Sequence, residues 1–224
     1  MTTKPTIIWD AGGVIYAFDQ SRTDRKLSAN SGRTVEEISA VLFGSSAGGR
    51  EYNAGLVEQF NLGKIDSNAF YDAVKKALGL TMTFDEFHDA WTDIFTLNKG
   101  IVGFIQDAHR AGYKQGVLSS TNPMHWGKMN SMFDLEALLG KDRVVCTYHP
   151  DAGQKKPHPA LFEATLRRLR ATAPECIYVD DVQKYADAAE KLGIKGVHVD
   201  ITQQDFQEKC IEDLGFLLEF WDKI

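Results

Sequence analysis

An apolar stretch near the start of the chain ends at an acidic residue that two glycines follow closely. Residues 6–16 read TIIWDAGGVIY, which places Asp10 directly after four strand-forming residues. In open α/β sheets, ligands bind beyond the carboxyl ends of the strands, where glycines allow a ligand to approach the backbone. The stretch therefore predicts a buried strand that presents the Asp10 carboxylate at its end, although Asp-x-Gly-Gly is also ordinary turn chemistry.

Three later stretches place further polar groups beside apolar runs. Residues 117–122 read VLSSTN, whose hydroxyls and backbone N–H groups suit an oxyanion at a strand-to-helix turn. Lys156 precedes Pro157, which we expect in the first turn of a helix. Residues 177–181 read IYVDD, two acids after an apolar strand. Because the carboxyl ends of parallel strands meet at one edge of a sheet, the four stretches predict one shared site.

The second half of the chain has the pattern of a parallel sheet. From residue 99 onward, short apolar runs alternate with helix-period apolar faces around residues 161–169, 185–192 and 206–221. This alternation predicts βαβ units and an α/β fold. The strands that we expect are residues 6–9, 115–119, 143–146, 176–179 and 196–199.

The segment between residues 17 and 97 has a helical pattern, and we expect no strand in it. Thr34 with Glu37 and Thr83 with Glu86 have capping-box spacing, and each pair is followed by helix-period apolar positions. A third apolar stripe is closed by Gly79. The pattern predicts an all-helical region inserted after the first strand. We expect its aromatic residues mainly in its core, with one or two reaching the site: Phe43, Phe60, Trp91 and Phe95.

Length, composition and charge are those of a soluble globular protein. The chain has 224 residues, long enough for one core and an insertion, with 43% apolar and 25% charged residues. Its net charge of -6 argues against general binding of nucleic acids or anionic membranes. Three scattered cysteines form no Cys-x-x-Cys pair and are typical of a reducing compartment. With no apolar leader or membrane-length stretch, we expect a cytoplasmic protein.

The four stretches, in this order, resemble the motifs of the haloacid dehalogenase superfamily, which includes many magnesium-dependent phosphatases. The resemblance covers the whole chain, because capped members insert helices between the first and second motifs. It implies a Rossmann-like core formed by residues 1–17 and 98–224, and a helical cap formed by residues 18–97. The nearest subgroup has Asp-x-Gly-Gly-Val in its first motif and includes sugar-phosphate phosphatases.

The resemblance implies a role for each motif. Asp10 is the nucleophile that forms an aspartyl-phosphate, and Lys156 holds this carboxylate and the phosphoryl oxygens. Mg²⁺, a hard cation, binds Asp10, Asp181 and a backbone carbonyl near Gly12. Asp180 orients Lys156 or a metal-bound water. The remaining phosphoryl oxygens are bound by groups of the second motif: Ser119, Ser120 and Asn122.

One position departs from the phosphatase pattern. Phosphatases of the superfamily usually carry a second Asp two residues after the nucleophile, as general acid and base, and here that position is Gly12. Such proton transfer typically contributes about 10²–10⁴-fold. Asp19 and His125 are the candidates to replace the missing acid, although Asp19 can also belong to the linker into the cap and His125 can be a packing residue.

Three classes of function remain open at this point. The first, which the acid pair at residues 180 and 181 favours, is a Mg²⁺-dependent phosphohydrolase of a small phosphorylated metabolite, with sugar phosphates preferred. The second is a phosphate-binding protein of the same fold with little or no turnover. The third is a metal-free 2-haloacid dehalogenase, a branch that also lacks the second Asp of the first motif. We expect a monomer or homodimer with no nucleic-acid or membrane partner.

Overall fold

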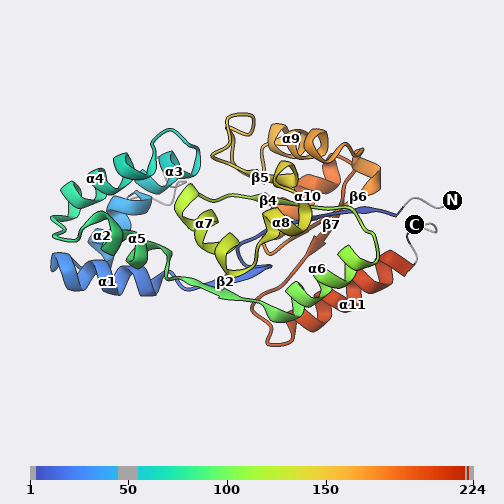
Figure 1. Ribbon diagram of the computed structural model, residues 1–224, viewed down its shortest axis with the longest axis horizontal. Helices are drawn as coiled ribbons and strands as arrows, with labels where there is room; N and C mark the ends of the chain where they lie inside the picture. The colour runs from blue at the N-terminus through green and yellow to red at the C-terminus, as the bar shows by residue number, and fades with distance from the viewer. Residues whose placement is uncertain (1–3, 45–54, 220, 222–224) are drawn as a thin grey trace.

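A five-stranded parallel sheet forms the centre of the computed structural model, which describes residues 4–44, 55–219 and 221 (Figure 1). Its order is β5-β4-β1-β6-β7. The strands are β1 (Thr6–Trp9), β4 (Gln115–Ser119), β5 (Val144–Cys146), β6 (Cys176–Asp180) and β7 (Lys195–His198). The predicted α/β class is confirmed, and the predicted strand ends differ from these by at most one residue.

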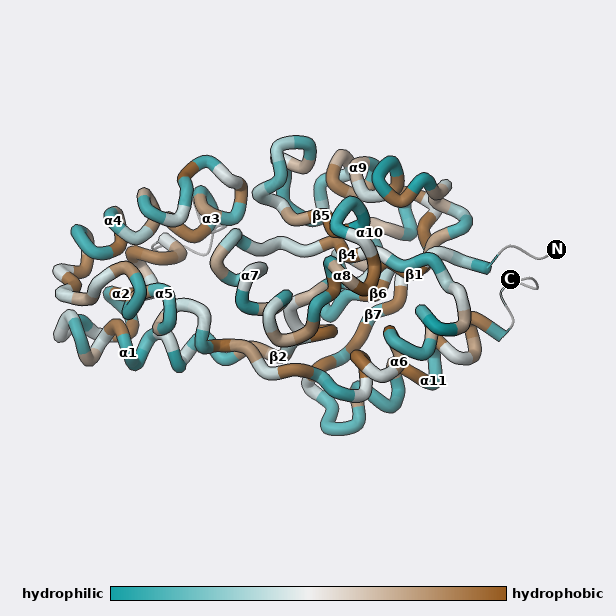
Figure 2. Tube along the Cα trace, viewed as in Figure 1, coloured by the Kyte–Doolittle hydropathy of each residue, from teal (hydrophilic) through white to brown (hydrophobic). Residues whose placement is uncertain are grey.

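Helices cover both faces of the sheet, which explains why its central strands are mainly apolar. One face packs against α6 (Lys99–Arg110), α7 (Pro123–Met132), α8 (Leu135–Leu139) and α11 (Phe206–Glu219). The other packs against α9 (Pro159–Leu169) and α10 (Gln183–Lys191). Alternate residues of β1, β4, β5 and β6 belong to opposite clusters, as Ile7 and Ile8 do. Figure 2 shows the strands as the apolar centre of this region. Two 3₁₀ turns, η1 (Lys141–Arg143) and η2 (Ala173–Glu175), precede β5 and β6.

A group of helices lies beside the sheet, at the end opposite the chain termini (Figure 1). It consists of α1 (Ser21–Ser31), α2 (Val35–Phe43), α3 (Leu56–Asn61), α4 (Ser67–Leu78) and α5 (Phe84–Thr92). These helices surround their own apolar cluster, which Met124 of α7 joins. Both predicted capping boxes form, and Gly79 ends α4 in the left-handed conformation. The structure thus contains a separately packed helical region, and we propose that it is the cap domain of residues 18–97.

Two short strands connect this region to the sheet, so the expectation of no strand between residues 17 and 97 is wrong. β2 (Tyr16–Phe18) pairs antiparallel with β3 (Phe95–Leu97). Three residues are too few for a period-two pattern to be seen in the sequence. The pairing places side by side the two segments by which the chain enters and leaves the helical region. None of the helices that the structure describes has the length and apolar character needed to cross a membrane.

Candidate active site

Three ionisable side chains from separate motifs meet at the carboxyl end of the sheet. Asp10 follows β1 and Asp180 ends β6, which is its neighbour in the sheet. The Nζ atom of Lys156 lies 3.0 Å from Asp10 Oδ1 and 2.7 Å from Asp180 Oδ2. All three residues are at least 94% buried. A buried ammonium is therefore shared between two carboxylates, as the order of the motifs predicts.

Lys156 reaches this position from a loop rather than from a helix start. The prediction that Pro157 occupies the first turn of the following helix is wrong, because α9 begins at Pro159 and His158 is its N-cap. His158 Nδ1 accepts the N–H of Ala160 at 3.2 Å. The second proline of the Lys-Pro-His-Pro stretch fits the helix start equally well, and only the structure distinguishes the two.

A fourth residue, Tyr178, belongs to this network and was missed by the sequence analysis. Its hydroxyl donates a hydrogen bond to Asp180 Oδ2 and accepts one from Lys156 Nζ at 3.0 Å. Tyr178 and Asp180 are two residues apart on β6 and so lie on the same face of the strand. The signal available in the sequence was this i,i+2 spacing before the acid.

For both Asp10 and Lys156, the effect of burial on the pKa opposes the effect of the attraction between them. Burial raises the pKa of Asp10 to about 7, against the Coulomb attraction of Lys156, and the nearby Asp180 and Asp181 add to the rise. Burial alone would lower the pKa of Lys156, but the attraction of Asp10 and Asp180 outweighs it and raises this pKa. Lys156 is thus held in its charged form.

The two adjacent acids have different surroundings. Asp180 has both oxygens engaged, since Oδ1 accepts the N–H of Val182 at 2.8 Å and Oδ2 bonds Lys156 and Tyr178. Asp181 lines a cavity, is only partly buried and makes no ion pair among the described residues. Burial and the charge of Asp180 raise the pKa of its carboxyl. Asp181 therefore has a carboxylate available to a ligand.

Carboxylate oxygens of Asp10, Asp180 and Asp181 all lie within 4.8 Å of one another. Asp10 Oδ1 accepts the N–H of Ala11 at 2.7 Å and pairs with Lys156, while Oδ2 has no partner among the described residues. Three carboxylates next to one ammonium form a site of excess negative charge. Its carboxylate oxygens, including the free carboxylate of Asp181, fit a hard divalent cation.

The two glycines of the first motif differ in whether the structure requires a glycine at that position. Gly13 has φ +85°, and a Cβ there would overlap the carboxylate of Asp181. Gly12 does not have a positive φ, and a Cβ there would meet Phe18 at 3.7 Å, an ordinary contact. Gly13 is therefore required by the close approach of Asp181, whereas the backbone at position 12 accommodates a side chain.

The second motif forms the turn between β4 and α7. Ser119 is buried at the end of β4, and all three predicted residues, Ser119, Ser120 and Asn122, line the cavity above Asp10. Asn122 is the N-cap of α7, where its Oδ1 accepts the N–H of His125 at 3.0 Å. Its Nδ2 donates to Asn61 Oδ1 on α3 at 3.1 Å. The Asn122 side chain thus joins the sheet region to the helical region.

A cavity of about 270 Å³ lies between the two regions. Its floor is polar and comes from the four motifs: Asp10, Gly12, Ser119, Ser120, Thr121, Asn122, Lys156 and Asp181. Its opposite wall comes from the helical region and the two connecting strands: Phe18, Gln20, Phe43, Val57, Asn61, Trp91, Ile94 and Phe95. Phe43, Trp91 and Phe95 therefore reach the site, and Phe60 packs within the helical cluster.

Comparisons with known proteins identify the family. The sequence profile of the haloacid dehalogenase-like hydrolases matches residues 57–199, which include Lys156, Asp180 and Asp181. The chain belongs to this family. It is a hydrolase of the haloacid dehalogenase superfamily, as the motif resemblance implied.

Relatives of this hydrolase support the assignment over nearly the whole chain. It is 24% identical over 219 residues to a protein of Mycobacterium tuberculosis named as a phosphatase, covering 95% of this chain and 96% of the relative. A family enzyme from Bacteroides thetaiotaomicron, solved with magnesium and inorganic phosphate, has a TM-score of 0.73 at 19% identity, covering 90% and 97%. A predicted haloacid dehalogenase-like family hydrolase of Porphyromonas gingivalis has a TM-score of 0.74 at 20% identity, covering 95% of this chain and 98% of the other.

Both candidates for the missing acid of this hydrolase are engaged with other partners. His125 lines the cavity, but its Nε2 lies 3.0 Å from the Trp91 carbonyl, which can only accept, and its Nδ1 lies 3.2 Å from the Asn122 amide. Burial lowers the pKa of His125 to about 4, so its ring is neutral at pH 7. Asp19 is exposed, lies outside the cavity and bonds the N–H and hydroxyl of Ser21, which lowers its pKa.

Proposed function

We propose that this protein is a Mg²⁺-dependent phosphohydrolase that cleaves a small phosphorylated metabolite through an aspartyl-phosphate on Asp10. The observation that carries the proposal is the arrangement of Asp10. Asp10 lines the cavity, and its Oδ1 is fixed by Lys156 and by the N–H of Ala11. Its Oδ2 has no partner among the described residues. A carboxylate held in this way is oriented for attack.

The proposed reaction has two displacements at phosphorus. In the first, Asp10 Oδ2 forms a bond to phosphorus while the ester P–O bond breaks, and the leaving oxygen departs with the bonding electron pair and takes up a proton. In the second, water attacks the phosphorus of the acyl phosphate, which releases inorganic phosphate, a proton and the Asp10 carboxylate. Splitting the hydrolysis in this way replaces one difficult step with two easier ones.

The balance of charge supports a metal ion. Three carboxylates next to one ammonium would repel a phosphate dianion. Mg²⁺ would be held by Asp10, Asp181 and the backbone near Gly12, and when bound it neutralises this charge and polarises the phosphoryl group. Asp180 keeps Lys156 charged and in place. The phosphoryl oxygens are bound by Lys156 and by the turn after β4, which supplies Ser119, Ser120 and backbone N–H groups.

The proton supply remains the distinctive feature of this site. Position 12 carries no acid, and the geometry of His125 and Asp19 favours neither as its replacement. We therefore propose that the leaving group departs largely as an anion or takes its proton from water. Turnover then depends steeply on the pKa of the leaving group, with aryl and acyl phosphates faster than alkyl phosphates.

The decisive experiment is a phosphate-release assay with aryl, acyl, alkyl and sugar phosphates, each with and without Mg²⁺, on the wild type, Asp10→Asn and Asp19→Asn. Asp19 is the matched control because it is an exposed carboxylate outside the cavity. We expect Asp10→Asn to lose on the order of 10⁴-fold or more in kcat and Asp19→Asn to keep wild-type rates.

Binding measurements with Mg²⁺ and phosphate, and a halide-release assay, separate the alternatives. Mg²⁺ and phosphate binding without turnover of any ester would indicate a phosphate-binding protein. Release of halide from a 2-haloacid without metal would indicate a dehalogenase. Activity in Asp10→Asn within tenfold of the wild type would remove the nucleophile assignment.

A further inference from the structure

The described residues that form the wall of the cavity opposite Asp10 are mostly apolar. From this we infer that the leaving group of the substrate is apolar and uncharged, so that the substrate is the phosphate ester of an aliphatic or aromatic alcohol. This inference rests on the proposed function and deepens it. It differs from the sugar phosphates that the resemblance favours, which stay a prediction and become the competing outcome of the test below.

The apolar wall is formed by side chains from five separate elements. Phe18 and Phe95 come from the two connecting strands, and further groups come from α2, α3 and α5 or their ends: Phe43, Val57, Trp91 and Ile94. Among the described residues, no Lys, Arg, Asp or Glu of residues 18–97 lines this cavity. A charged group on the leaving side of the substrate would find no charged partner among the described residues of this wall, and burying it unpaired costs free energy.

The polar groups among the described residues of this wall are few, and two of them are partly engaged. Asn61 Oδ1 accepts the Asn122 amide at 3.1 Å, and Gln20 Nε2 donates to Asp24 Oδ1 at 3.2 Å. In the described part of the chain, the indole Nε1 of Trp91 is the one buried side-chain nitrogen or oxygen without a partner. A polyol has several hydroxyls that need partners when they are removed from water, and beyond the Trp91 N–H the described residues of this wall supply few.

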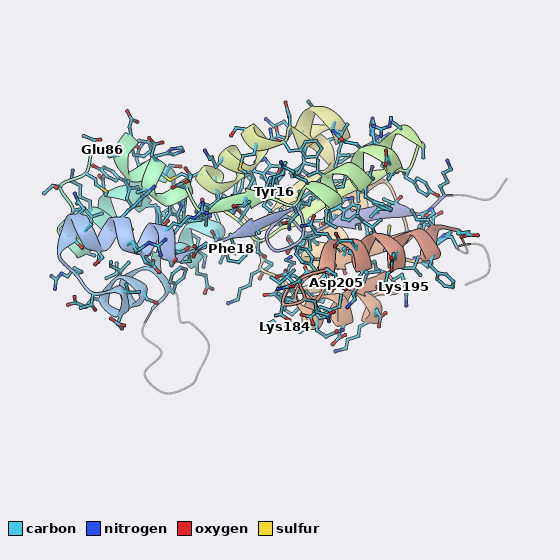
Figure 3. The ribbon with its side chains drawn as sticks, turned by 90° about the horizontal axis from the view of Figure 1, so that it is seen from below. Tyr16, Phe18, Glu86, Lys184, Lys195 and Asp205 are labelled. Carbon is cyan, nitrogen blue, oxygen red and sulfur yellow. The ribbon has the colours of Figure 1, made fainter. Side chains whose placement is uncertain are left out.

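Phe18 shows where the leaving group would lie. Its side chain is 55% exposed, although it is large and apolar, and it stands beside Gly12 in the loop of the nucleophile. Figure 3 shows Phe18 between the helical region and the sheet region. An apolar group bonded to the phosphate at Asp10 can cover this ring and remove both surfaces from water.

The apolar space has a limited length. An adjoining cavity of about 240 Å³ shares six lining residues with the first: Phe43, Val57, Asn61, Ser120, Lys156 and Tyr185. Its lining also includes Lys155 and Glu58, which form a partly exposed ion pair at 3.3 Å. We therefore expect an apolar chain to gain affinity with length until it reaches this charged pair.

The test uses n-alkyl phosphates from ethyl to octyl, because their leaving groups have nearly the same pKa and differ only in apolar length. We expect kcat/KM to rise roughly threefold for each added methylene until the rise levels off. Benzyl phosphate should exceed a hexose 6-phosphate, whose leaving group is also a primary alcohol. A flat or falling series, or a preference for the hexose phosphate, would overturn the inference.

A matched pair of variants locates the effect. Phe18→Ser should lower kcat/KM for the longer esters by roughly three- to tenfold and flatten the increase with chain length. Phe18→Leu should keep part of the increase in kcat/KM with chain length that Phe18→Ser loses. Phe216→Ser, an equally exposed phenylalanine on α11 outside the cavity, is the control and should keep the wild-type slope. An unchanged slope in Phe18→Ser would contradict the placement of the leaving group.

The two proposals fail in different ways. If no phosphate ester or acyl phosphate is turned over with Mg²⁺, the proposed function fails. If acetyl phosphate and p-nitrophenyl phosphate are turned over but apolar length has no effect, the proposed function stands and the inference on the leaving group is wrong.

Discussion

The floor and the opposite wall of the cavity are stabilised in different ways. On the floor, Lys156 is buried between Asp10 and Asp180, and each charge depends on its partners. On the opposite wall, Trp91 and Phe95 both pack against the His125 ring, with 4.7 Å and 5.1 Å between ring centroids. The floor is held by directional polar bonds and the wall by apolar area, so substitutions in the two should have different consequences.

Substitutions in the floor and in the wall should differ in their free-energy cost. Removing one partner of a buried ion pair leaves an unpaired charge in the interior and typically costs about 3–5 kcal/mol of folding free energy. Trimming one apolar group that lines a cavity changes the affinity for a ligand in proportion to the area lost. We therefore expect floor variants to change stability, metal binding and turnover together, and wall variants to change the choice of substrate.

The largest expected effects come from the two adjacent acids. Asp181→Ala should weaken Mg²⁺ binding by at least about tenfold with little loss of stability, because its carboxylate makes no ion pair among the described residues. Asp180→Ala should lower the free energy of unfolding by about 1–3 kcal/mol, because it leaves the Tyr178 hydroxyl and the Val182 N–H without their acceptor while Lys156 keeps its pair with Asp10. Calorimetry with Mg²⁺ and urea unfolding measure the two effects.

The comparison of these two variants decides their roles. If Asp180→Ala weakened Mg²⁺ binding more than Asp181→Ala in protein that is still folded, the two assignments would have to be exchanged.

A smaller effect is expected from restoring the missing acid. Gly12→Asp should fold, because the backbone there does not have a positive φ and the added Cβ would meet Phe18 at an ordinary 3.7 Å. It should raise the turnover of alkyl phosphates by about tenfold or more and flatten the dependence on leaving-group pKa. Steady-state kinetics with phosphates of graded leaving-group pKa measure this dependence.

Gly13→Ala is the matched control for this variant. Its Cβ would overlap the Asp181 carboxylate at a residue with positive φ, so metal binding or folding should be lost. A wild-type enzyme with little leaving-group dependence would show that another residue already supplies the proton.

The part of the molecule that could be predicted from the sequence is the part whose signal is local. The apolar runs before Asp10 and Asp180 lie on buried strands, and the capping box of Thr34 and Glu37 marks a helix start. These features depend on neighbours within a few residues. The order of the motifs then places Lys156 beside both acids, as the structure shows.

The remaining features depend on contacts that no local pattern reports. β2 and β3 are three residues each and are strands only because they pair with each other. Trp91 is both a core residue of the helical region and part of the cavity wall. Tyr178 looks like any apolar strand residue until the position of the Lys156 ammonium is known. How the helical region faces the sheet is therefore what the sequence could not supply.

A modest effect within the floor is expected from Tyr178→Phe. This change removes the hydroxyl that bonds Lys156 and Asp180 and leaves their ion pair intact. We expect a loss of about 1–2 kcal/mol of stability and, since Tyr178 acts only through Lys156, a decrease in kcat with KM nearly unchanged. Urea unfolding and steady-state kinetics measure these quantities. Tyr185→Phe, at the cavity lining, is the control, and an equal effect there would argue against a specific role for the Tyr178 hydroxyl.

The smallest effect is expected at the ion pair that links floor and wall. Lys155 and Lys156 are adjacent, but Lys155 is exposed and its Nζ lies 3.3 Å from Glu58 of α3, whereas Lys156 is buried between two carboxylates. An exposed pair contributes about 0–1 kcal/mol and is screened by salt. Lys155→Met should therefore change kcat/KM by less than about fivefold, and the change should vanish near 1 M salt. A double-mutant cycle with Glu58→Gln measures the coupling. If Lys155→Met instead abolished turnover at every salt concentration, Lys155 would belong to the charged floor, and the division between floor and wall drawn from these two lysines would be wrong.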